Sequence, residues 1–304
     1  MDKKSMTALV SAFSRAYHSV ENKEKVFDDY LAKDILTKSE YNQIASNMSK
    51  GIKFFNPLFK GTEEEALRWI VDNQLSPSPL GRAAFAEKAL ENAVRIGAKQ
   101  YMIFAAGYDT FAYRQPEWAS EIQIFELDHS ATAIDKQKRI CSVVTEKPTN
   151  LHCVSVDFTE NNWENDLIAV TEFNQSKISF CSLLGISYYL SKETFAETIK
   201  TISSIVPKGS GIVFDYPDED SYTHKAGERA KKQAAMAGAA NEKMLASYSY
   251  LELEKLLADS NFLIYEHLTP KEITEQYFKE YNRLNPEHTI TAFDNVNYCL
   301  AVKK

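Results

Sequence analysis

The chain has 304 residues, 44% hydrophobic and 25% charged, which is the balance of a packed globular protein rather than a disordered one. Its net charge of -7 provides no general attraction for nucleic acid or anionic lipid. No apolar stretch approaches membrane-spanning length, and the N-terminal segment lacks the apolar region of a signal peptide. We therefore expect a soluble cytoplasmic protein without nucleic-acid or membrane partners.

Metal and disulfide chemistry find little support in the residue pattern. The four cysteines are widely scattered without CxxC pairing, and the six histidines show no metal-ligand spacing. No Ser/His/Asp series or nucleophile elbow is present. Hydrolase and metalloenzyme functions are therefore disfavoured, and no metal site is expected. Cys181 and Cys299 lie inside apolar runs, where cysteines act as small buried hydrophobes.

The N-terminal quarter predicts helices without a convincing strand. This pattern runs from about residue 5 to about residue 75 and ends where Pro77 and Pro79 follow one another closely. Because prolines punctuate helices, we expect a boundary there. The sequence thus predicts a helical extension over residues 1–79 and a larger domain over residues 80–304.

The rest of the chain alternates between apolar runs and helix-length segments. An apolar helix face over Ala86, Leu90 and Val94 ends at Gly97, which suits a C-terminal cap. Alternation of this kind indicates an α/β fold with a mainly parallel sheet. The seven predicted strands are Gln100–Ala105, Gln123–Leu127, Leu151–Val156, Ile178–Leu183, Gly211–Phe214, Phe262–Glu266 and Asn297–Val302.

An insertion of about residues 217–248 follows the fifth predicted strand. Its Ala- and Lys-rich middle has strong helix propensity. Because it follows a strand's carboxyl end, it is expected to overhang the sheet edge where ligands bind in such folds. Two readings stay open: a solvated helical excursion, or a lid that encloses a ligand together with the N-terminal helices.

The turn after the first predicted strand is the sharpest local feature. In Phe104–Thr110, the small residue Ala105 and the glycine Gly107 allow the backbone to approach a ligand closely, and Asp109 completes the turn. One glycine departs from the GxGxxG fingerprint of dinucleotide binding, and a glycine after a strand is often only a turn.

A carboxylate at the end of the second predicted strand strengthens the ligand reading. Asp128 lies twenty-one residues past Gly107, the spacing of one βαβ crossover. At that position a carboxylate accepts hydrogen bonds from the ribose hydroxyls of a nucleoside cofactor, and it disfavours NADP. After the third strand, Asp157 and Phe158 could meet the adenine, although Asp157 could equally cap the next helix.

These segments resemble the leucine carboxyl methyltransferase family, which includes protein phosphatase methyltransferases and tetracenomycin-type polyketide O-methyltransferases. The resemblance covers about residues 80–216. It rests on Gly97–Thr110, Tyr113-Arg114, Phe125–His129, Tyr189–Ser191 and Gly211–Asp215. It implies a Rossmann-like Class I methyltransferase fold with helical N-terminal and lid segments, S-adenosylmethionine (SAM) as cofactor, and methylation of an oxygen.

The resemblance assigns several residues to the cofactor. It places Arg82 and, from the N-terminal extension, Arg15 at the SAM carboxylate, and Asp128 at the ribose. It also implies that Gly107 is the glycine of the family's first cofactor-binding motif. Asp157 and Phe158 would lie next to the adenine. The acceptor would be a carboxylate or hydroxyl of a small molecule, or a peptide carboxyl terminus. For each arginine the alternative is a solvent-facing charge on an apolar stem.

Two departures from the family pattern keep a second hypothesis open. Phe111 stands where the family has arginine, and Leu184 stands where it commonly has glutamate beside the methionine part of SAM. A catalytically degenerate, SAM-binding member is therefore the alternative. His129 is interpreted mainly as a strand-end residue near the cofactor, although it could act as a base. Tyr113 and Arg114 are interpreted as structural residues, although they could bind an anionic acceptor. An NAD-dependent oxidoreductase lacks its glycine-rich fingerprint.

Overall fold

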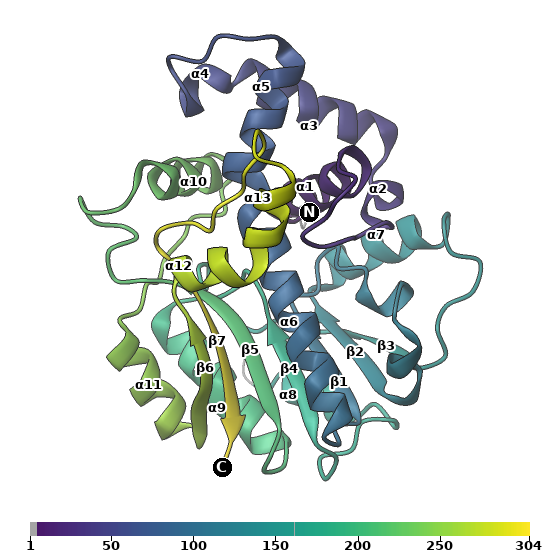
Figure 1. The fold of residues 1–304 in the computed structure, drawn as a ribbon. Coiled ribbons are helices and arrows are strands. Elements are labelled where there is room, and N and C mark those ends of the chain that lie inside the picture. The colour runs from purple at the N-terminus through teal and green to yellow at the C-terminus, as the bar shows by residue number, and fades with distance from the viewer. Residues whose placement is uncertain (1–4, 161) are drawn as a thin grey trace.

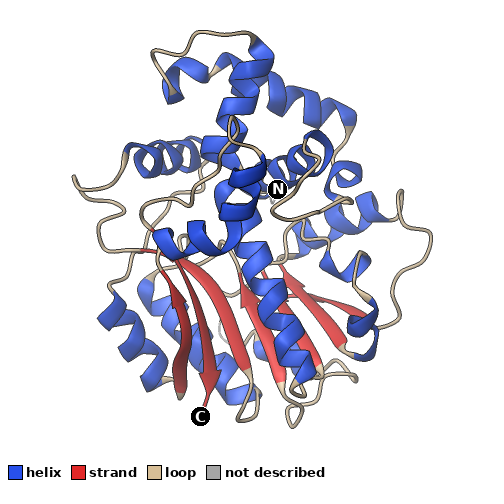
Figure 2. Ribbon diagram, in the orientation of Figure 1, coloured by secondary structure: helices blue, strands red, loops and turns tan. Residues whose placement is uncertain are grey.

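The computed structural model describes residues 5–160 and 162–304, so Met1–Lys4 of the predicted extension lie outside the described residues. One seven-stranded sheet forms the base of the molecule, and most helices of the N-terminal half gather above one edge of it (Figure 1, Figure 2). The strands are β1 (Gln100–Phe104), β2 (Gln123–Asp128), β3 (Leu151–Ser155), β4 (Ser179–Leu183), β5 (Gly211–Pro217), β6 (Phe262–Leu268) and β7 (Val296–Lys303).

The strand order is β3-β2-β1-β4-β5-β7-β6, and β7 runs antiparallel to both of its neighbours. The remaining pairs are parallel. Every residue of β1, β4 and β5 is buried, as expected for central strands covered on both faces. The predicted fold class and all seven strands are confirmed, and their ends differ from the prediction by a few residues.

Helices cover both faces of the sheet and its carboxyl edge. The helices are α1 (Met6–Glu21), α2 (Ala32–Ile35), α3 (Lys38–Lys50), α4 (Ile52–Phe55), α5 (Glu63–Ile70), α6 (Pro77–Arg95), α7 (Ser130–Ile140), α8 (Glu164–Ile168), α9 (Lys192–Ile205), α10 (Glu228–Ala239), α11 (Tyr250–Asp259), α12 (Pro270–Ile273) and α13 (Lys279–Leu284). Short 3₁₀ turns (Phe111–Tyr113, Glu117–Glu121) and π turns (Val71–Leu75, Thr274–Phe278) join some of them.

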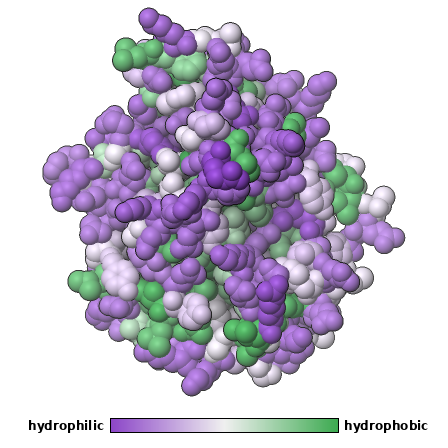
Figure 3. Space-filling model, in the orientation of Figure 1, coloured by the Kyte–Doolittle hydropathy of each residue, from purple (hydrophilic) through white to green (hydrophobic). Residues whose placement is uncertain are grey.

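Two hydrophobic clusters sandwich the sheet. Apolar residues of α6, such as Leu80 and Phe85, pack in one cluster, and Phe195 and Ile199 of α9 pack with α11 in the other. A third cluster lies within the N-terminal helices, where Leu9, Phe13 and Ile70 meet. The face seen in Figure 1 is mainly hydrophilic, and its apolar side chains form small separate areas (Figure 3).

The two prolines start a helix and do not interrupt the path of the chain. The backbone N–H of Ser76 donates to the carbonyl of Val71 over 2.9 Å, which closes a π turn at the end of α5. Pro77 then occupies the first position of α6, where its missing N–H costs nothing. A nearly continuous rod therefore runs from the N-terminal helices down to the sheet (Figure 1). The division at residues 79 and 80 stays a prediction.

The two ends of the predicted insertion lie side by side next to the end of β5. Asp218 and Tyr248 form an isolated β-bridge, and the segment between them contains α10. The guanidinium of Arg229 on α10 donates to the carbonyl of Asn73 over 2.9 Å, so the insertion is bonded to the π turn before α6. This position above the carboxyl edge of the strands supports the lid reading over a solvated excursion.

Candidate functional site

A cavity of about 830 Å³ lies between the carboxyl ends of the strands and the helices above them. Its floor comes from the ends of β1, β2 and β4, and its walls come from α1, the π turn, α6 and the insertion. The size lies toward the upper end of the range of about 300–1,000 Å³ for ligand pockets. The cavity therefore has room for a cofactor and a second small molecule.

The turn after β1 and the end of β2 meet at the floor of this cavity. The backbone N–H of Gly107 donates to the Asp128 carboxylate, whose other oxygen accepts from the N–H of His129 over 2.7 Å. Burial raises the pKa of Asp128, and these backbone hydrogen bonds oppose the rise. The predicted neighbours Gly107 and Asp128 thus lie side by side.

The turn itself has an unusual backbone. Gly107 has φ +52, and Ala105 has φ +48, which is uncommon for a residue with a side chain. Asp109 accepts from the N–H of Phe111 over 2.7 Å and stabilises the turn. Ala105, Gly107 and Asp109 all line the cavity. A non-glycine residue held in the left-handed region is typical of sites where backbone geometry serves a ligand.

Arg82 enters the cavity from α6 and is held by a buried carboxylate. Its guanidinium lies 3.2 Å from Asp215 at the end of β5, and Asp215 is fully buried. The hydroxyl of Tyr188 and the N–H of Gly185 also donate to this carboxylate, over 2.9 and 2.6 Å. Arg82 remains 19% exposed on the cavity side. Because Asp215 neutralises it, its pKa is raised despite burial.

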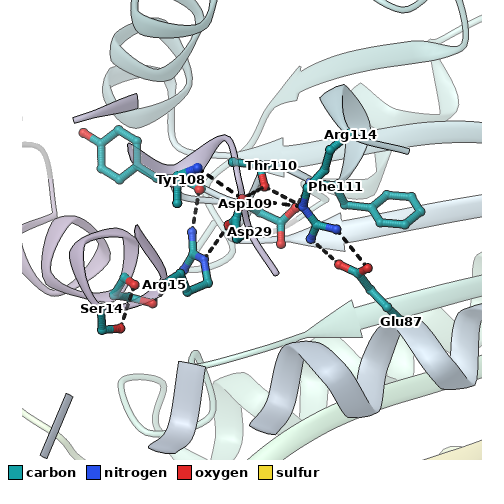
Figure 4. A network of polar contacts seen from close by, with 11 residues as sticks. Ser14, Arg15, Asp29, Glu87, Tyr108, Asp109, Thr110, Phe111 and Arg114 are labelled. Carbon is teal, nitrogen blue, oxygen red and sulfur yellow. Dashed lines mark hydrogen bonds and ion pairs between the residues drawn. The ribbon is translucent and has the colours of Figure 1, made fainter. Parts of the chain in front are cut away.

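Arg15 reaches the same cavity from α1. Its guanidinium donates to Asp29 over 2.8 Å, to the hydroxyl of Ser11 over 2.9 Å and to the carbonyl of Tyr108 over 2.7 Å (Figure 4). It therefore bonds the N-terminal helices to the turn after β1. The neighbouring arginine lowers the pKa of Asp29 in spite of its burial.

Arg114 is surrounded by polar partners from three segments. It forms an ion pair with Glu87 of α6, donates to the Thr110 hydroxyl over 2.8 Å and lies 3.5 Å from Asp29 (Figure 4). Phe111 is 1% exposed and packs edge-on against Tyr101 in the core below the site. The departure from the family arginine at this position thus places an apolar side chain in the core.

Asp157 and Phe158 do not line the cavity. The Asp157 carboxylate is half-buried and accepts from the N–H and hydroxyl of Thr159, over 2.9 and 2.6 Å, which lowers its pKa. Phe158 packs against Phe104 and Trp163, with ring centroids 5.4 and 5.3 Å apart. Asp157 therefore forms a local turn and does not cap the next helix, since the N-cap of α8 is Trp163. The adenine role of both residues stays a prediction.

His129 begins α7 as its N-cap. Its ring nitrogen Nδ1 accepts from the N–H of Ala131 over 3.4 Å, which favours the tautomer with the proton on Nε2. The lone pair of Nδ1 is thus engaged by the backbone at the start of the helix. The interpretation of His129 as a residue near the cofactor, rather than a base, therefore has the better support.

Three residues of the site escaped the sequence reasoning. Asp215 belonged to a recognised strand motif, but its role as the partner of Arg82 depends on β5 lying next to β4. Gly185 has φ +71, and a Cβ there would lie 2.7 Å from Cζ of Arg82. Glu242, in the insertion, accepts from the N–H groups of Met6 and Thr7 over 2.8 and 3.3 Å. In the sequence, Gly185 is recognisable as a glycine directly after a strand, and Asp215 as part of a strand motif, whereas nothing marks Glu242.

The residues present fit a nucleoside that carries an amino-acid tail. Each Asp128 oxygen already accepts one backbone N–H, and its remaining lone pairs are available to a diol. Gly107 and Asp128 both line the cavity, so a ribose there could reach them. Arg82 retains donors toward the cavity for a carboxylate. The cavity would therefore offer a hydrogen-bond acceptor to the ribose end of such a molecule and hydrogen-bond donors to its carboxylate end.

The strand order, the antiparallel β7 and the paired turn and acid at the sheet edge define a Class I methyltransferase fold. The family model for leucine carboxyl methyltransferases matches residues 8–203, and the chain belongs to that family. The predicted family, fold class and SAM cofactor are confirmed, as is a SAM-dependent methyltransferase activity at the level of the family.

Similar proteins agree with this assignment. Bacillus subtilis YktD, named as a candidate SAM-dependent methyltransferase, is 41% identical over 99% of this chain and 98% of its own. A Mycobacterium tuberculosis protein with the same kind of name is 28% identical over 50% of this chain and 43% of its own. A solved DUF574 family protein of Streptomyces avermitilis shares the fold, with a TM-score of 0.61, 10% identity and 97% of each chain covered.

Within residues 5–160 and 162–304, no helix is both long and apolar enough to cross a membrane. The same residues contain no group of three or more His, Cys, Asp or Glu side chains that could hold a metal ion. Cys181 and Cys299 are buried, and burial raises the pKa of both thiols. They behave as the apolar core residues that the sequence predicted.

Proposed function

We propose that this protein binds SAM in the described cavity and transfers its methyl group to an oxygen of a small-molecule acceptor. The observation that carries the proposal is the pairing of the Gly107 turn with Asp128 on the floor of a cavity that Arg82 also enters. Family membership supports the methyl transfer. The choice of oxygen as the methylated atom rests on the resemblance. The choice of a small acceptor over a peptide terminus rests on the size of the cavity.

The chain's residues divide the work of holding the cofactor. Asp128 would accept hydrogen bonds from the ribose hydroxyls, and Arg82, fixed by Asp215, would pair with the carboxylate of the tail. Three of the five N–H donors of Arg15 are engaged, by Asp29, Ser11 and the Tyr108 carbonyl. It therefore supports the turn at Tyr108 and stands second to Arg82 as a carboxylate partner. Ala105 and Asp109 would shape the turn around the nucleoside.

Bound SAM supplies a methyl group on a positively charged sulfonium, so the donor needs no further activation. The protein's contribution is to align the acceptor oxygen with that methyl group and to exclude water. A carboxylate acceptor would be ionised at neutral pH, whereas an alcohol or phenol would have to lose a proton. The proposal includes both acceptor types, and a cytoplasmic location, which the four free cysteines favour.

The insertion and the first helix would act together as a lid. The Glu242 carboxylate accepts from N–H groups in the first turn of α1, where a helix terminus favours negative charge. Both segments line the cavity, so this contact closes one side of it. Opening of the lid would require that these hydrogen bonds break, and ligand entry would follow.

Calorimetric titration of S-adenosylhomocysteine into wild-type protein and into Asp128→Asn tests the proposal. We expect binding to wild type and a loss of tenfold or more in the variant, since a charged hydrogen-bond partner is removed. Absence of binding to wild type at millimolar ligand would overturn the proposal. The degenerate alternative predicts binding without turnover. A screen of metabolite extracts for S-adenosylhomocysteine formation separates the two.

A further inference from the structure

Gln74 is a buried amide on the wall of the cavity. Gln74 is 5% exposed, and its side-chain oxygen has no hydrogen-bond partner among residues 5–160 and 162–304. Leaving a buried polar atom unsatisfied costs about 1–3 kcal/mol. Gln74 also lines a large cavity. Its oxygen has almost no accessible surface, so the amide must turn about its last side-chain bond before a ligand in the cavity can supply the missing partner.

The backbone around Gln74 is arranged to present it. Gln74 belongs to the π turn Val71–Leu75, and such turns are rare and frequent at functional sites. The turn is fixed on one side by the hydrogen bond from Ser76 to Val71 and on the other by Arg229 of the insertion. The position of the amide is therefore set by the backbone and by the lid together.

Gln74 lies on a different wall from Gly107 and Asp128. These two residues belong to the strand ends, whereas Gln74 and Leu75 belong to the π turn, against which α10 packs. If Arg82 on α6 holds the SAM tail, the part of the helical wall around Gln74 is left for the acceptor. It also includes parts of α1 and α3.

The lining around this wall is rich in flexible apolar side chains. Four of the six methionines in the chain, Met6, Met48, Met236 and Met244, line the cavity. Methionine adapts to irregular shapes and makes favourable sulfur contacts with aromatic rings. Such a wall therefore suits an apolar, aromatic acceptor better than a polar acceptor that must keep its bound water.

The charges of the cavity disfavour an anionic acceptor. Its three arginines are each paired with a carboxylate: Arg15 with Asp29, Arg82 with Asp215 and Arg114 with Glu87. Three further acidic residues line the cavity, namely Asp109, Asp128 and Glu242, against the exposed Lys243. With the remaining donors of Arg82 taken by the SAM carboxylate, an anionic acceptor would meet more negative than unpaired positive charge, and like charges repel at short range.

We propose that Gln74 binds the methyl acceptor, and that the acceptor is an uncharged, largely aromatic molecule that donates an O–H or N–H hydrogen bond to the Gln74 amide. This inference rests on the proposed function, because it assumes that the opposite wall holds SAM. It narrows that proposal, since it favours a neutral acceptor over a carboxylate or a peptide terminus.

The test uses 2-naphthol and 2-naphthoate as a matched pair, because the two share a ring system and differ in charge at pH 7. Each is titrated calorimetrically into the full chain saturated with S-adenosylhomocysteine. The proteins are wild type, Gln74→Met, which keeps the side-chain length, and Gln43→Met, an exposed control on α3. Urea unfolding is measured for all three, and Gln74→Leu is the second variant if Gln74→Met does not fold.

We expect wild type and Gln43→Met to bind 2-naphthol, and to bind 2-naphthoate at least tenfold more weakly. Gln74→Met should bind 2-naphthol about three- to tenfold more weakly while it unfolds at a higher urea concentration, because the unsatisfied amide is gone. Equal naphthol affinity in wild type and Gln74→Met, tighter binding of naphthoate, or no binding of either would overturn the inference. If S-adenosylhomocysteine itself does not bind, the proposed function fails instead.

Discussion

Gly185 offers the sharpest test of how Arg82 is positioned. The change is Gly185→Ala, and two effects follow from the geometry. Its φ of +71 lies in the left-handed region, which costs a residue with a Cβ about 1–2 kcal/mol. The new Cβ would also lie 2.7 Å from Cζ of Arg82, so the guanidinium must move away from Asp215.

The second effect is the larger one. Full separation of a buried ion pair costs about 3–5 kcal/mol, and Asp215 would keep only its hydrogen bonds from Gly185 and Tyr188. We therefore expect Gly185→Ala to lose about 3 kcal/mol or more of the free energy of unfolding. If Arg82 binds the SAM carboxylate, the affinity for S-adenosylhomocysteine should fall about 10- to 150-fold, the value of a charged hydrogen bond of about 1.5–3 kcal/mol.

Gly209→Ala is the matched control. Gly209 has φ +87, and a Cβ there would meet only Cδ1 of Ile178, at an ordinary 3.7 Å. It should show the backbone cost alone and leave ligand affinity unchanged. Urea unfolding and calorimetry on the two variants give both quantities. If Gly185→Ala matched Gly209→Ala in stability and bound S-adenosylhomocysteine like wild type, the assigned role of Arg82 would be wrong.

Three further outcomes are expected. Burial raises the pKa of Asp128, so S-adenosylhomocysteine affinity should decline on acidification with a midpoint above 3.8, and a pH-independent affinity in calorimetry would contradict this. Burial raises the pKa of Asp72 to about 6, so the folded state holds its proton more tightly. As the pH rises from about 4 to about 6, the free energy of unfolding of wild type should therefore fall relative to that of Asp72→Asn. Parallel pH profiles of the two proteins in urea unfolding would refute this. Glu242→Gln weakens the charge-assisted bonds to α1, so S-adenosylhomocysteine should dissociate several-fold faster in stopped flow, whereas an unchanged rate would argue against a lid.

Periodicity was enough to predict the sheet. Central strands such as β1 and β4 are short, continuous apolar runs between helix-length segments, and a parallel sheet demands that alternation. The proximity of Gly107 and Asp128 was predictable as well, since one crossover connects adjacent parallel strands. Local pattern and topology agree at these positions, so chain order alone brings the residues together.

The rest of the site depends on contacts between distant segments. Asp215 follows Arg82 by 133 residues, and no local pattern announces that pairing. Glu242 and the first turn of α1 lie 236 residues apart at Met6. The prolines at positions 77 and 79 predicted a boundary, because a π turn that leads smoothly into a proline-started helix has no distinct sequence signal. Packing between elements, rather than propensity within them, decides these features.

The position of β7 determines when the sheet can close during synthesis of the chain. This strand, the last of the seven along the chain, lies between β5 and β6 rather than at the margin. Until residues 296–303 leave the ribosome, the nascent chain carries an unpaired edge at β5 that can recruit other chains. Deletion of residues 296–303 should therefore show itself first as aggregation, because the gap would fall within the sheet.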